Sequence, residues 1–303
     1  MFPFGARLTT PPPLPRPVPP FPGETTLSYL HRLAAANQIR TSDLQAHLAG
    51  TREPAPVSID ALAAATGRSP QSLARALPEL RPGFDPAADA HIRRTVCWRC
   101  AARRGAFRFA VTWKPAEVNL CPSHPVWLGP PVRNVHGLQH DVGSAPEIIR
   151  AQGHHRRLAR EAGRRAAAAA FAEAAPITAL WARHGLHRDR RPLVHAVTGR
   201  RPLTGRLQPG DPLIPVVTYP ESVALARVLA MPRWRQPPDA AADDELRQFR
   251  LAVDHLLEIH YQPEGGPYDP LYRWFRKAGG TGNSSDLPQL QRDNRLPGQV
   301  SPI

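Results

Sequence analysis

The sequence has little of several things that would assign it to a class at once. It has no run of about 20 apolar residues, so it predicts no membrane-spanning helix. Its first residues lack the charged start and apolar core of a signal peptide, from which we expect a cytoplasmic protein. It has only three cysteines, an odd number, which excludes a scaffold of disulfides. It also has no Walker loop and no glycine-rich dinucleotide fingerprint, so no enzyme is indicated.

Lysine is almost absent from a strongly basic chain. The formal net charge of the 303 residues is +14, and all basic residues except Lys114 and Lys277 are arginine. Arginine favours bidentate contacts with phosphate or carboxylate, and a basic protein without a membrane segment most often meets nucleic acid. Hydrophobic residues make up 42% of the chain, which is enough for one or two buried cores. The expected partner is therefore double-stranded DNA.

Apolar residues at helical spacing predict a mainly α fold. The two motifs described below divide it into a helix-turn-helix N-terminal domain with an inserted small zinc ribbon, followed by a C-terminal helical region. One long alanine-rich helix is expected from His154 to Ala175, ended by Pro176, then a basic loop over 185–212 and a short strand over 213–218. The predicted parts are a proline-rich disordered lead-in (1–22), the helix-turn-helix domain (23–91), the zinc ribbon (92–130), a helical region with a basic loop (131–231), a C-terminal helical segment (232–278) and a disordered tail (279–303).

All three cysteines lie in one pattern with a histidine. Cys97 and Cys100 are separated by two residues, and Cys121 and His124 form a second such pair 20 residues further on. Two tight turns that each supply two ligands can converge on one tetrahedral ion, and thiolates with an imidazole suit zinc. Four protein ligands leave no open position, so the pattern predicts one structural zinc ion. Short strands are expected between the two pairs, over 107–113 and 118–120.

Residues 59–77 have the spacing of a helix-turn-helix. Ala63 allows close approach of two helices, Gly67 permits the turn, and Ser69 would cap a second helix that starts at Pro70. Such a second helix meets base edges in DNA-binding proteins. An ordinary pair of packed helices has the same pattern. The candidate DNA contacts of this helix are Arg68, Ser69, Gln71, Ser72 and Arg75.

Two further basic stretches are candidates for phosphate contacts. Between His91 and Trp113 the sequence has six arginines, among them Arg103 and Arg104, and no acidic residue. A second stretch begins near Arg156 and continues through the alanine-rich helix, where His154 and His155 are interpreted as surface residues. Either stretch could equally be a solvated face. The aromatic residues at 268–275 fit either interface anchors or a small core.

The N-terminal part resembles the TniQ family of transposition-associated proteins. The resemblance rests on Pro22-Gly-Glu24-Thr-Thr-Leu-Ser28-Tyr29-Leu30-His-Arg32-Leu33-Ala34, on the segment from Leu62 to Leu73, and on the Cys97–Cys100 and Cys121–His124 pairs with Leu128 after them. It covers residues 15–130, less than half of the chain. Trp98 departs from the proline that the family usually has there, and no further cysteine pair follows Leu128.

The resemblance implies a protein that helps select DNA targets and contacts transposition proteins, such as a transposase and an AAA+ ATPase, without itself cutting or joining strands. A stand-alone transcription regulator with the same parts is the first alternative. A zinc-stabilised adaptor that binds only protein is the second. Whether the chain forms a homodimer stays open.

Overall fold

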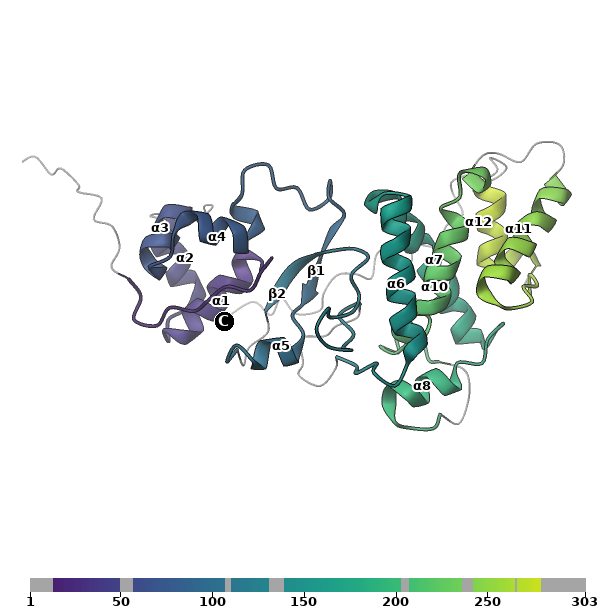
Figure 1. Cartoon of the computed structure of the whole chain (residues 1–303), viewed down its shortest axis with the longest axis horizontal. Helices are drawn as coiled ribbons and strands as arrows, with labels where there is room; N and C mark the ends of the chain where they lie inside the picture. The colour runs from purple at the N-terminus through teal and green to yellow at the C-terminus, as the bar shows by residue number, and fades with distance from the viewer. Residues whose placement is uncertain are drawn as a thin grey trace, which may run out of the picture. The chain divides into compact units, whose positions relative to one another are not determined.

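The computed structural model describes residues 13–49, 57–106, 110–130, 139–202, 207–235, 242–264 and 266–278. These residues form twelve α-helices and one two-stranded sheet, which confirms the mainly α fold (Figure 1). The chain divides into two compact units, with the boundary between Arg227 and Val228. Among the described helices, none combines the length and the apolar character that crossing a membrane would need.

The first unit begins with four short helices, α1 (Thr26–Ala36), α2 (Thr41–Ala49), α3 (Ile59–Thr66) and α4 (Pro70–Ala76). Thr25, Ser58 and Ser69 cap three of them, each by accepting a hydrogen bond from a backbone N–H in the first turn. The helices share one apolar core, because each directs its leucines to the same side. Its fully buried members include Tyr29, Leu30, Leu33, Leu44, Leu48, Leu62, Leu73 and Leu77.

The segment before α1 differs from its prediction. Composition predicts disorder up to residue 22, but residues 13–22 are placed by a buried ion pair: Arg32 donates to both carboxylate oxygens of Glu24, each at 2.8 Å. Glu24 also accepts the backbone N–H of Phe21 at 2.9 Å, and Arg32 donates to the Pro19 carbonyl at 2.8 Å. Residues 13–22 form no helix or strand, and hydrogen bonds to side chains of the following helix region hold part of this segment in place. Residues 1–12 lie outside the described residues.

The small sheet pairs β1 (His91–Thr95) with β2 (Val111–Pro115) in antiparallel register, Arg93 opposite Trp113. The strand predicted over 107–113 therefore starts only at Val111, with 107–109 outside the described residues. The strand predicted over 118–120 is wrong, since Leu120 makes only an isolated bridge to Trp127. The actual partner strand contains two adjacent arginines, so hydrophobicity alone does not reveal it.

A helical part follows: α6 (Pro146–Glu161), α7 (Arg164–His184), α8 (Arg191–Thr198), α9 (Ile214–Val217) and α10 (Tyr219–Leu229). Three predictions are corrected here. The long helix is two helices, separated at Gly163, whose φ of +83° no α-helix can contain. The basic loop over 185–212 contains α8, and the predicted strand over 213–218 contains α9 instead.

Pro176 lies inside α7 and does not end it. A proline removes one backbone hydrogen bond, but α7 buries a continuous stripe on both sides of this position. The stripe comprises Ala167, Ala170, Ala174, Ile177, Thr178, Trp181 and Ala182. Tertiary packing of this stripe outweighs the local cost of the proline.

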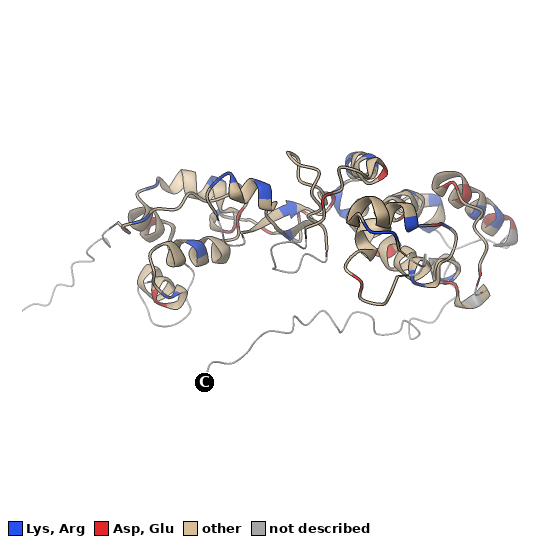
Figure 2. Cartoon of the chain, turned by 90° about the horizontal axis from the view of Figure 1, so that it is seen from below, with Lys and Arg blue, Asp and Glu red and all other residues tan. Residues whose placement is uncertain are grey.

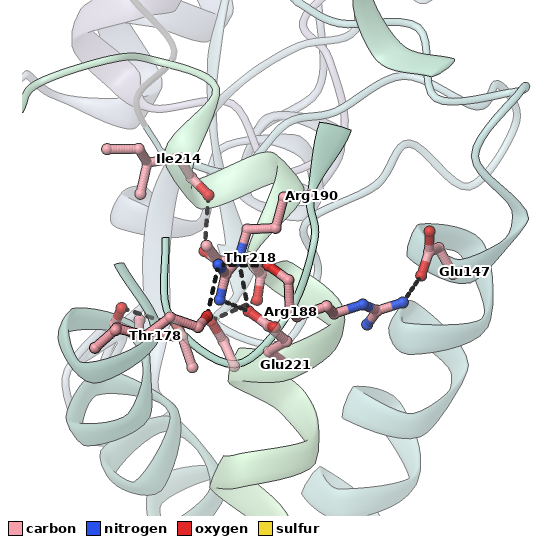
Figure 3. Close-up of polar contacts among 10 residues, drawn as sticks. Glu147, Thr178, Arg188, Arg190, Ile214, Thr218 and Glu221 are labelled. Atoms are coloured by element: carbon pink, nitrogen blue, oxygen red, sulfur yellow. Dashed lines mark hydrogen bonds and ion pairs between the residues drawn. The ribbon is translucent and has the colours of Figure 1, made fainter. Parts of the chain in front are cut away.

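A second buried ion pair joins the segment before α8 to α10 (Figure 3). Arg190, 1% exposed, donates Nε and Nη2 to the same oxygen of Glu221, at 3.0 and 2.7 Å. Its remaining nitrogen donates to the carbonyls of Leu186 and Arg188. Arg188 in turn pairs with Glu147 of α6. Although Arg190 lowers it, burial as the larger effect raises the pKa of Glu221.

The second unit contains η2 (Pro232–Arg235), α11 (Ala242–Leu257), η3 (Gly266–Tyr268) and α12 (Pro270–Ala278). Its core is aromatic: Phe249 contacts Trp234, Trp274 and Phe275 with ring centroids 4.9–6.0 Å apart. Phe275 is buried, whereas Tyr268 is 81% exposed. Of the aromatic residues at 268–275, Phe275 and Trp274 thus belong to this core. The predicted tail 279–303 lies outside the described residues.

Candidate metal centre and nucleic-acid interface

Two turns of the chain bring the three cysteines and His124 together. Cys97 follows β1 and precedes α5 (Trp98–Ala102), whose first turn carries Cys100. Cys121 follows the bridge residue Leu120, and its N–H donates to the Val126 carbonyl, which closes the second turn around His124. The structure therefore brings together all four predicted ligands, with their ligand atoms within 4.8 Å of one another.

The distances between the ligand atoms fit one tetrahedral ion. His124 Nδ1 lies 3.5 Å from Cys97 Sγ, 3.4 Å from Cys100 Sγ and 3.7 Å from Cys121 Sγ, and the sulfurs of Cys100 and Cys121 are 3.6 Å apart. Zinc bonds of about 2.3 Å to sulfur and about 2.0–2.1 Å to nitrogen predict tetrahedral edges of about 3.8 Å between sulfurs and about 3.6 Å from sulfur to nitrogen. The cluster is compatible with a zinc site.

Two thiols of this cluster, those of Cys97 and Cys100, resist deprotonation when no cation is bound. Burial, with neighbouring thiols adding to it, raises the pKa of Cys100 to about 12 and also raises that of Cys97. A bound divalent ion would instead lower the pKa of these thiols, because it stabilises the thiolates directly. Val126 and Leu128 pack against the cluster as an apolar wall. A resident ion would fix the two turns to each other and supply no reaction.

Residues 139–141 contact the chain on both sides of Cys97. The Trp98 N–H donates to Gln139 at 2.8 Å, Gln139 donates to the Val96 carbonyl at 3.1 Å, and Arg99 pairs with Asp141 at 2.6 Å. The Trp98 ring itself is 45% exposed although it lies between two ligands. Arg99 lies over it, with its guanidinium carbon 5.1 Å from the ring centroid.

A buried polar network contacts the segment that leads into Cys121. His155, expected at the surface, is fully buried, and its Nδ1 lies 3.0 Å from the Tyr219 hydroxyl. Gln152 accepts the N–H groups of Asn119 and Leu120, and Arg94 donates to the Asn119 side chain at 2.7 Å. His155 shares its helix face with the buried apolar residues Ile148, Ala151, Leu158 and Ala159, a spacing that could have revealed it.

The burial of His155 makes the stability of the protein depend on pH. Burial, and to a smaller degree Arg94, lowers the pKa of His155 to about 4, so the folded protein holds it neutral. The unfolded chain binds a proton at the ordinary pKa of about 6.5, so stability should fall as the pH falls below that value. The difference in proton binding costs the folded state about 1.4 kcal/mol at pH 5.5, against about 0.2 kcal/mol at pH 7.

We therefore expect the decrease in unfolding free energy between pH 7 and 5.5 to be about 1.2 kcal/mol smaller in His155→Gln than in wild type. Urea unfolding at both pH values measures it. His154→Gln changes the exposed neighbouring histidine and should keep the wild-type dependence. Equal pH dependence in wild type and His155→Gln would contradict a buried neutral His155.

The predicted DNA contacts of the helix pair lie around the start of α4. Gly67 has φ +66°, and Ser69 accepts the N–H of Ser72 at 3.3 Å, so the turn and the cap form where the sequence places them. Gln71 and Arg75 are exposed on this helix, while Arg68 is half-buried against the Tyr29 hydroxyl. Exposed Ser69, Gln71 and Arg75 and partly exposed Ser72 thus lie at or near the start of α4, whereas Arg68 is half-buried.

The two arginines after α5 are also exposed, but they differ in their contacts. Arg103 makes no side-chain hydrogen bond or ion pair with another described residue. Arg104 lies over the Phe21 ring, 5.1 Å from its centroid, and donates to the Pro20 carbonyl at 3.4 Å. Arg103 is therefore open to a ligand, and Arg104 partly serves to hold the N-terminal segment.

Comparison with known proteins adds one finding. No curated protein and no solved structure matches the chain. One family model matches residues 15–128, a range that contains the four N-terminal helices, the sheet and all four residues of the Cys/His cluster. That family is TniQ, which confirms the resemblance seen in the sequence, and residues 15–128 form a TniQ domain.

Proposed function

We propose that this protein is a non-catalytic DNA-binding accessory protein that helps target-site selection in transposition by bridging DNA and transposition proteins. The TniQ domain supports a transposition-associated accessory role. The DNA part rests on one observation: exposed Gln71 and Arg75 on α4, and exposed Arg103 beside the metal cluster, belong to this same domain. A transposase and an AAA+ ATPase are the partner classes that we propose.

One structural zinc ion, held by Cys97, Cys100, Cys121 and His124, is part of the proposal. It would join the turn after β1 to the turn after Leu120 and so fix the position of α5. Arg103 and Arg104 follow α5 directly. The ion would thereby position basic residues for DNA without touching DNA itself.

DNA binding should separate into two components. Arg75→Ala is expected to weaken binding selectively at a preferred sequence by about 1–3 kcal/mol, because a side chain at a base edge discriminates between bases. Arg103→Ala with Arg104→Ala should weaken binding on all duplexes and lower the slope of log affinity against log salt by roughly 0.9 for each phosphate that is no longer neutralised. Fluorescence anisotropy over a salt series measures both.

Asp60→Asn is a suitable control, since it alters an exposed residue of α3 and leaves α4 unchanged. If the wild-type protein fails to bind duplex DNA at low salt, the proposal is wrong and the protein-only adaptor takes its place. If it binds a single operator and associates with no transposition protein, the transcription regulator is the better description.

A further inference from the structure

Helix α6 lies outside the TniQ domain and has two sharply different faces. One face is buried and comprises Ile148, Ala151, Gln152, His155, Leu158 and Ala159. The opposite face is exposed along the helix and carries Arg150, His154, Arg156, Arg157 and Arg160. In Figure 2 the positions of arginine and lysine are blue on the ribbon, and those of aspartate and glutamate are red. The exposed face is therefore mostly basic, although Ile149, Gly153 and Glu161 also lie on it.

Acidic residues neutralise only part of this surface. Glu161 pairs with Arg157 at 2.6 Å, and Glu147 pairs with Arg188 from outside the helix. Arg150, Arg156 and Arg160 make no ion pair or side-chain hydrogen bond with any described residue. Arg156 and Arg160 are one helical turn apart, so two like charges repel each other across that turn. A bound polyanion would relieve this repulsion.

Hydrogen bonds and an ion pair join α6, or the residues just after it, to the segment that precedes Cys121. Gln152, on the buried side of α6, accepts the N–H groups of Asn119 and Leu120 at 2.9 and 3.0 Å and donates to the Glu117 carbonyl at 2.6 Å. Arg164, just after α6, pairs with the Glu117 carboxylate at 3.2 Å. Because Asn119 and Leu120 lead directly into Cys121, α6 cannot move independently of the cluster. Its arginines are presented by a rigid support.

We propose that the exposed face of α6 binds the phosphate backbone of duplex DNA through Arg150, Arg156 and Arg160. Residues four apart are separated by about 6 Å along a helix, so Arg156 and Arg160 can reach neighbouring phosphates of one strand. Guanidinium groups suit bidentate contacts with phosphate. Between these arginines lies Gly153, where no atom is within 4 Å of the position a Cβ would take, so a backbone can approach closely.

These contacts carry no sequence information, because they go to phosphates. The inference shares with the proposed function the choice of DNA as ligand, but it concerns residues that the TniQ domain does not contain. The proposal gives the region after residue 128 a role in holding DNA next to the cluster of Cys97, Cys100, Cys121 and His124.

The test uses the full chain with Arg156→Gln and Arg160→Gln together. On two unrelated duplexes alike, the slope of log affinity against log salt should fall by roughly 1.8, which is 0.9 for each of the two phosphates that these arginines neutralise. Arg157→Gln with Glu161→Gln alters the same face without a change of net charge and should keep the wild-type slope. Arg200→Gln with Arg201→Gln removes the same charge from exposed residues elsewhere and should have a smaller effect.

An unchanged slope for the Arg156/Arg160 pair overturns the proposal, and so does an equal fall for the Arg200/Arg201 pair, which would be an effect of bulk charge. If circular dichroism shows that the first pair is unfolded, Arg150→Gln alone should lower the slope by roughly 0.9, and an unchanged slope there overturns the proposal as well. Substitutions at Arg75, Arg103 and Arg104 are measured in parallel. A response at α6 without one in the TniQ domain removes the proposed contacts of that domain and leaves this inference standing.

Discussion

Cys100→Ser is expected to reduce the bound zinc from about one ion per chain to nearly none. A serine hydroxyl is a poor zinc ligand, and the three remaining ligands of the cluster cannot close a tetrahedral structural site. Because the unfolded chain holds no preformed site, removal of the ion should also loosen residues 91–128. Elemental analysis of the purified protein measures the metal, and limited proteolysis measures the loosening.

Trp98→Ala is the matched control, since Trp98 lies between two ligands, is 45% exposed and offers no ligand atom. It should retain one zinc ion per chain. Equal metal content in wild type and Cys100→Ser would remove the site. Absence of zinc from both variants would mean that the metal depends on the fold of α5 in general and would contradict the assigned ligand set.

Arg190→Met should destabilise the first unit by about 3–5 kcal/mol at pH 7, because it leaves the buried Glu221 carboxylate without its counter-ion. It also frees the carbonyls of Leu186 and Arg188 (Figure 3). Burial already raises the pKa of Glu221, and the variant should raise it further. An acid with a raised pKa in the folded state is best tolerated when protonated, so the difference from wild type should shrink as the pH is lowered toward 4.

Urea unfolding of wild type and variant at pH 7 and near pH 4 measures this difference. Arg191→Met is the matched control, because the next residue pairs with Asp189 on the surface, with both side chains about half exposed. Its effect should be within experimental scatter, since exposed ion pairs contribute little. A destabilisation by Arg190→Met no larger than that by Arg191→Met would contradict a structural role of the buried pair.

The correct expectations came from local patterns. The spacing of the cysteines and His124 predicts the cluster because each pair spans one tight turn, a geometry that needs few residues. Gly67 and Ser69 predict the turn and the cap of α4 for the same reason, since φ and the first hydrogen bonds depend on adjacent residues.

The wrong expectations mostly concern elements that distant contacts decide. Pro176 predicts a helix end, yet α7 continues because its buried stripe packs against other elements. His155 is interpreted as a surface residue from its immediate neighbours, yet Tyr219, 64 positions later, contacts it in the core. No strand is predicted at Arg93 and Arg94, yet β1 pairs with β2 there, and Arg94 is buried against Asn119.

By itself the sequence determined the mainly helical class, the four residues of the Cys/His cluster and the TniQ resemblance, because each depends on short-range spacing. Only the tertiary structure decided what surrounds them. It buried Glu24 with Arg32 and Glu221 with Arg190, and it joined Gln152 of α6 to the segment before Cys121. Among the described residues, it also left Arg156 and Arg160 without an ion pair. Such pairings are absent from local patterns because a buried charge or a free surface arginine is defined by residues that are far away in the chain.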